Sequence, residues 1–106
     1  MEHVHVRDAA ARCLMEIRER KAYVSAAVDR WIERFPDTVS ARDKALFTHL
    51  VYTTLTHESA IAYRIDRVAK RPLRTMKPYI AATLEVAAAQ VFYDDRIPDR
   101  AAIHEA

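Results

Sequence analysis

The sequence predicts an all-α fold, a compact bundle of five to six helices, on three observations. The 106-residue chain contains no glycine, which is the residue that β-bulges and tight hairpin turns most often require. Hydrophobic residues make up 51% of the chain but aromatic residues only 8%, and many of the hydrophobic residues are alanine, the strongest helix former. Apolar residues also recur at the three- and four-residue spacing of a helix face.

The first two helices are expected at residues 7–20 and 23–33. Each has an apolar stripe at helical spacing, formed by Ala10, Cys13, Leu14 and Ile17 in the first and by Val24, Ala27, Val28 and Trp31 in the second. The second helix should end before Pro36, because the residue that precedes a proline avoids the α conformation.

The third helix is expected to begin after Ser40, a good N-cap residue followed three positions later by Asp43. Its predicted core stripe consists of Leu46, Phe47, Leu50, Val51, Thr54 and Leu55. The pattern breaks around His57 and resumes in a fourth helix, with Ile61, Ile65 and Val68 on its stripe, which ends near Lys70.

The fifth helix is expected at residues 76–93, with Pro78 in its first turn, where a proline lacks no needed N–H group. We expect its inward side to consist of Ile80, Leu84, Ala87 and Val91. A short last helix should start at Asp99 and end with the chain. A helix this short is stable only when it is packed, which predicts that the natural domain continues beyond residue 106.

The clearest charge feature is a run of basic residues between the fourth and fifth helices, opposed only by Asp66. It consists of Arg64, Arg67, Lys70, Arg71, Arg74 and Lys77. Such clusters bind phosphate groups, because each neutralised phosphate releases counterions. The alternative is a solvated helix end whose cations complement the helix dipole. The net charge is only +2, and no exposed aromatic residues for base stacking are evident between the basic positions.

A second candidate surface lies opposite the predicted core stripes of helices three and five. It consists of His49, Tyr52 and Thr56 on the third helix and of Ala82, Glu85, Val86, Ala89 and Tyr93 on the fifth. Small residues around a tyrosine, with few long charged side chains, suit the centre of a protein interface. The alternative is that alanine fills these positions for its helix propensity alone.

No catalytic, metal or cofactor site is predicted. Phosphate-binding loops and dinucleotide fingerprints need glycine, and the histidines lack the three or four converging ligands of a zinc site. The single cysteine, Cys13, is expected to be a buried apolar residue, and it excludes an internal disulfide. No apolar run is long enough to cross a membrane, so we expect a soluble cytoplasmic protein without a small-molecule substrate.

Several stretches, in this order, resemble the NusB-like N-terminal domain of bacterial rRNA cytosine-5 methyltransferases of the RsmB (Sun/Fmu) type. They are Val6-Arg7-Asp8-Ala9-Ala10, Ala22-Tyr23, Asp43-Lys44-Ala45-Leu46, Leu50-Val51-Tyr52, Arg71-Pro72-Leu73, Met76-Lys77-Pro78 and Ile97-Pro98-Asp99-Arg100-Ala101-Ala102-Ile103-His104-Glu105-Ala106. The resemblance implies a single domain over residues 1–106 that lacks the last helices of the family domain. It also implies binding of RNA, here rRNA, rather than catalysis, because such enzymes carry their catalytic cysteines and S-adenosylmethionine site in a separate domain.

The sequence departs from the family pattern mainly in helices three to five. Thr53 and Ala87 stand where related chains have glycine, Glu85 where arginine is usual and Ala89 where tyrosine is usual. The family also often has glycine near Lys21. These differences leave an alternative open, an engineered or repurposed protein-binding scaffold that uses the exposed faces of helices three and five.

Overall fold

The computed structural model describes residues 5–93, which form five α-helices and one 3₁₀ turn and no strand. The helices are α1 (Val6–Arg20), α2 (Val24–Arg34), α3 (Ala41–Thr56), α4 (Glu58–Val68) and α5 (Pro78–Tyr93), and the turn η1 (Leu73–Thr75) lies between α4 and α5. The predicted all-α class is confirmed. The short helix expected from Asp99 lies outside the described residues.

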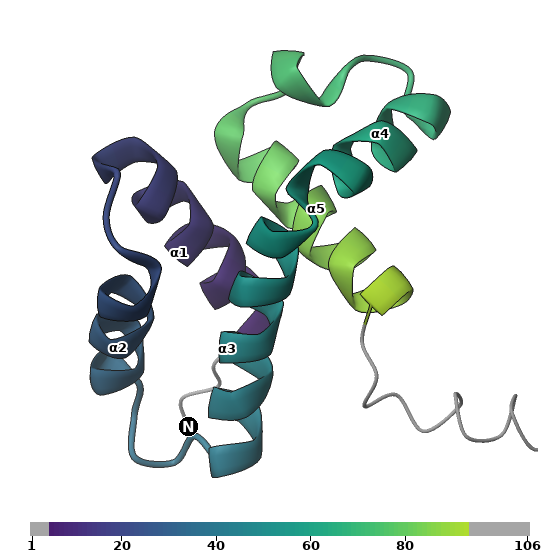
Figure 1. Ribbon diagram of the computed structural model, residues 1–106. Coiled ribbons are helices and arrows are strands. Elements are labelled where there is room, and N and C mark those ends of the chain that lie inside the picture. The colour runs from purple at the N-terminus through teal and green to yellow at the C-terminus, as the bar shows by residue number, and fades with distance from the viewer. Residues whose placement is uncertain (1–4, 94–106) are drawn as a thin grey trace, which may run out of the picture.

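The helix α1 lies at the centre of the fold, against α2, α3 and α5, while α4 packs on α5 and η1 (Figure 1). Six of the fully or almost fully buried residues are alanines, namely Ala9, Ala10, Ala11, Ala27, Ala82 and Ala89. Small side chains let helix backbones approach one another closely, and this accounts for a core with few aromatic residues.

Phe47 on α3 is the largest fully buried side chain. The ring of Phe35 meets it edge-on with 5.0 Å between centroids, and Trp31 lies 6.3 Å from it. These contacts fix α2 against α3. The buried stripe predicted for the first helix is confirmed. In the third helix the four central positions of the predicted stripe are buried, while Leu46 and Leu55 at its two ends are partly buried against the core.

Two helix ends, the start of α3 and the end of α1, have well-defined capping structures. The Ser40 hydroxyl accepts a hydrogen bond of 3.0 Å from the Asp43 N–H at the start of α3, as predicted. The helix α1 ends at Lys21, whose φ of 54° and ψ of 40° are left-handed. This is the conformation that glycine usually supplies after a helix, and here a lysine adopts it.

The orientation predicted for the fifth helix is wrong. Ile80 and Leu84, expected in the core, are 49% and 39% exposed, and Ala87 and Val91 are also exposed. The positions expected on the surface, Ala82, Glu85, Val86 and Ala89, are buried. The reason is that α5 packs against α1, α3 and α4, so its narrow alanine-rich side faces the other helices and its larger apolar side chains point outward.

Candidate nucleic-acid interface

All six residues of the predicted basic run are exposed. We call them the basic segment: Arg64 and Arg67 on α4, Lys70 and Arg71 in the following loop, Arg74 on η1 and Lys77 just before α5. The loop lies at one end of the molecule, at the top of Figure 1. The structure therefore leaves all six cations exposed to solvent.

The opposing carboxylate in this segment, Asp66, is used within the fold. Its side chain accepts a hydrogen bond of 2.7 Å from the Leu73 N–H and so holds the start of η1. Leu73 is itself buried against Ile61 and Ile65 of α4. This bond and the buried leucine tie the basic loop to the helix before it.

Thr75 holds the other side of the loop. Its hydroxyl donates a 2.7 Å hydrogen bond to the Pro72 carbonyl and accepts one of 3.1 Å from the Arg71 guanidinium. Arg71 also donates to the Thr75 carbonyl. Among the basic residues Arg71 is thus partly engaged in shaping the loop, whereas the side chains of Lys70 and Arg74 form no hydrogen bond or ion pair with the described part of the chain.

Aromatic rings do accompany the basic residues, contrary to the prediction. Tyr63 and Phe92 are 63% and 46% exposed. The guanidinium carbon of Arg64 lies 4.5 Å from the centroid of the Phe92 ring, and that of Arg67 lies 5.6 Å from the Tyr63 ring. The four-residue spacing of Tyr63 and Arg67 was visible in the sequence, but Phe92 comes from another helix and only the fold brings it there.

These side chains line an open groove of about 710 Å³ between α4 and the end of α5. Its lining residues are Ser59, Ala60, Tyr63, Arg64, Arg67, Val68 and Phe92. Val68, expected on the buried stripe of the fourth helix, is instead exposed in this groove. Val68 is the last residue of α4, and Ile65 is the last α4 residue that is buried.

A network of charges joins α1, α4 and α5. Arg18 of α1 binds both carboxylate oxygens of the buried Glu85 on α5, at 2.8 and 3.0 Å, and Glu58 at the start of α4, at 2.7 Å. The hydrogen bond with Glu85 raises the pKa of Arg18 above its ordinary value. Glu85 can be buried only because this partner reaches it, so its predicted role on an exposed binding face is wrong.

The α3 residues of the predicted protein-binding surface are more exposed than its α5 residues. Tyr52 and Thr56 are exposed and His49 is partly buried, close to the Thr53 hydroxyl. Tyr93, also partly buried, stacks on His57 with 3.9 Å between ring centroids. The predicted surface is therefore divided, because four of its five α5 residues, all except Tyr93, are buried.

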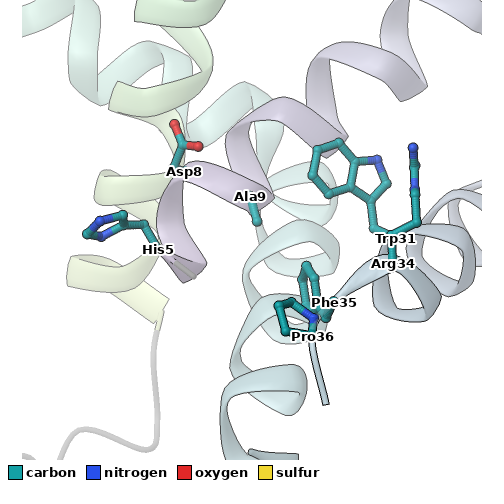
Figure 2. Close-up of a pocket in the computed structure, with 7 residues that line it drawn as sticks. All are labelled: His5, Asp8, Ala9, Trp31, Arg34, Phe35 and Pro36. Atoms are coloured by element: carbon teal, nitrogen blue, oxygen red, sulfur yellow. The ribbon is translucent and has the colours of Figure 1, made fainter. Parts of the chain in front are cut away.

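A second pocket, of about 350 Å³, lies between the first turn of α1 and the end of α2 (Figure 2). Figure 2 shows His5 and Asp8 on one side of the α1 turn and Trp31, Phe35 and Pro36 on the other. Asp8 is bound to Arg12 and to the Tyr79 hydroxyl, and the hydrogen bond from Tyr79 lowers its pKa.

Neither nucleophile nor metal chemistry is supported by the described residues. Burial raises the pKa of the Cys13 thiol to about 12, which keeps it protonated. Residues 5–93 contain no cluster of three or more side chains of the metal-binding types His, Cys, Asp and Glu. Within the same residues, no helix combines the length and apolar character needed to span a bilayer.

The described residues form a small all-α helical bundle, and sequence comparison identifies its family. The model of the NusB family matches residues 4–106, so the chain belongs to the NusB family. The confirmed resemblance leaves only the first three residues outside the matched region.

Two relatives are both named "Probable ribosomal RNA small subunit methyltransferase B". The one from Bacillus subtilis (strain 168) is 33% identical over 106 residues, which is all of this chain and 23% of that protein. The one from Synechocystis sp. (strain ATCC 27184 / PCC 6803 / Kazusa) is 26% identical over 101 residues, 95% of this chain and 22% of that protein. The chain thus spans less than a quarter of the length of these relatives. No solved structure gives a significant match.

Proposed function

We propose that this chain is a non-catalytic RNA-binding module that contacts structured rRNA through the basic segment. The observation that carries the proposal is the exposure of all six cations, none of which forms an ion pair with a carboxylate of the described residues. Because no carboxylate is paired with them, these cations are available to phosphates. The family membership and the names of the two relatives support RNA as the ligand.

The catalytic step of a methyltransferase is not assigned to this chain. The family match accounts for residues 4–106 with a NusB domain alone, and the described cysteine is buried and protonated. A module that binds rRNA would act in the cytoplasm. The engineered-scaffold alternative required an exposed face on α5, and most of that face is buried. The comparisons give this alternative no support. Tyr52 and its neighbours on α3 remain as a site for a protein partner.

The test is the salt dependence of binding to an rRNA fragment. For every phosphate that is neutralised, the plot of log affinity against log salt steepens by about 0.7 for single strands and about 0.9 for duplexes. Replacing two cations that have no hydrogen-bond or ion-pair partner among the described residues, Lys70→Gln with Arg74→Gln, should therefore flatten the slope by about 1.4–1.8. Fluorescence anisotropy with a labelled fragment at several salt concentrations measures both slopes.

The matched control is Arg42→Gln with Lys44→Gln, which removes the same charge at the start of α3. That helix end lies at the opposite side of the molecule from the basic loop (Figure 1). The control should keep the wild-type slope. Binding that is insensitive to salt, or an equal loss of slope in both double variants, would contradict the proposed site.

A further inference from the structure

The outer face of α5 carries large apolar side chains that no other part of the described chain covers. Ile80, Leu84 and Val91 are 49%, 39% and 71% exposed, and Ala87 between them is also exposed. Nine large hydrophobic side chains are exposed in the described residues, and five of them lie on this one helix. The opposite side of α5 packs against α1, α3 and α4, so the outer face is left without a partner within residues 5–93.

The four residues of this face have the spacing of a helix-packing seam, and we call Ile80, Leu84, Ala87 and Val91 the outer seam. They follow one another at intervals of four, three and four residues, which is the a/d spacing by which one helix packs along another. At a rise of about 1.5 Å per residue the seam extends over about 17 Å. A long, narrow apolar stripe of this kind fits a second helix better than a small ligand.

The charge of α5 restricts what that second helix can be. Glu85 is the only charged residue of α5, and it is buried and paired with Arg18. A basic or acidic partner would therefore find no ion pair on the exposed side of α5. A second copy of the same face meets no penalty, because a two-fold axis would bring no like charges together.

The outer seam is also complementary to itself when the second helix runs antiparallel. A two-fold axis between Leu84 and Ala87 sets Leu84 opposite Ala87 of the second copy and Ile80 opposite Val91 of the second copy. At the centre each leucine thus faces the space above a small alanine. A parallel pair would instead set Ala87 opposite Ala87 of the second copy and leave a gap there.

We propose that the outer seam is a dimer interface, on which a second copy of this chain packs its own α5 in the antiparallel direction. A single helix pair of this length is smaller than the standard interface of about 800 Å² per partner. The dimer is therefore reversible, with a dissociation constant of roughly 10–100 μM. The inference does not depend on the proposed RNA-binding function.

The test is sedimentation velocity of the 106-residue chain, without RNA, at concentrations from about 5 to about 500 μM. The mass of the wild-type chain should rise from the 12.2 kDa of one copy toward twice that value. Ala87→Glu should remain monomeric, because it would place two carboxylates beside the two-fold axis. Ala87 is exposed and glutamate suits a helix, so this variant should fold, which circular dichroism verifies. The matched control is Ala45→Glu, at an exposed alanine of α3, which should dimerise as the wild type does.

Mixing two variants tests the arrangement at the axis. Ala87→Lys should also be monomeric alone, but an equal mixture of Ala87→Glu and Ala87→Lys should form a heterodimer, because opposite charges then meet across the axis. A mixture that stays monomeric would overturn the antiparallel arrangement. A wild-type chain that is monomeric at every concentration would overturn the dimer, and so would a dimer that Ala87→Glu leaves as stable as Ala45→Glu does. The salt-dependent RNA binding described above is a separate measurement and would stand in each of these cases.

Discussion

Lys21 shows at the scale of one residue what it costs a chain to fold without glycine. Its backbone is left-handed at the end of α1, and its N–H donates to the Ile17 carbonyl to close the helix. A side chain with a Cβ atom is disfavoured in this conformation by roughly 1–2 kcal/mol. The contacts that follow Lys21 hold the turn in place. Ala22 and Val24 pack against the core, and the Ala22 N–H donates a 3.2 Å hydrogen bond to the same Ile17 carbonyl.

Lys21→Gly should therefore stabilise the domain, by about 0.5–1 kcal/mol once the greater freedom of glycine in the unfolded chain is subtracted. Urea unfolding measures the change. The neighbouring Arg20→Gly is the control, because Arg20 lies within the helix. This substitution should lower the free energy of unfolding by about 1 kcal/mol. A destabilised Lys21→Gly variant would show that the left-handed backbone carries no cost.

At the scale of one element, α5 illustrates why helical periodicity alone can choose the wrong face. Apolar residues of α5 lie on all sides of the helix, so two of its faces could be buried in the core. One face carries large residues, and the other carries small residues and Glu85. A preference for large side chains in the core selects the first stripe. The close approach of α1 and the reach of Arg18 to Glu85 select the second.

Two side-chain truncations test which face of α5 is buried. Val86→Ala removes buried methyl groups and should cost about 2 kcal/mol. Leu84→Ala removes a larger side chain yet should cost less than about 1 kcal/mol, because Leu84 is partly exposed. Thermal or urea unfolding gives both values, and the reverse order of the two costs would restore the orientation expected from the sequence.

At the scale of the whole molecule, Cys13 reports on the integrity of the core. It lies inside the cluster that joins α1, α2, α3 and α5, where burial raises its pKa to about 12. A thiol that is both inaccessible and protonated does not react. Any reaction at pH 8 must therefore pass through an opening of this cluster.

Alkylation of Cys13 by a maleimide or iodoacetamide reagent at pH 8 should accordingly be slow in the native protein and fast in urea. Its rate should follow the population of the open form. Mass spectrometry of samples quenched over time measures it. Native labelling as fast as that of a free thiol would mean that α1 is not packed as described.

Much of the fold was predictable because its determinants are local. The spacing of apolar residues located all five helices, and Ser40 with Asp43 located the start of α3. The six cations of the basic segment were also predictable, because charged side chains without a buried partner remain in water. The exposed aromatic rings beside them were missed, since Phe92 reaches Arg64 only through the packing of α5 on α4.

The sequence by itself determined the helical class, the family resemblance and the basic segment, because composition, capping and helical spacing act over a few residues. Only the tertiary structure decided which side of α5 is buried and which rings lie beside the arginines. The physical reason is that both depend on contacts between helices distant along the chain. Glu85 is buried where Arg18 can pair with it, and the groove exists where α4 meets the end of α5.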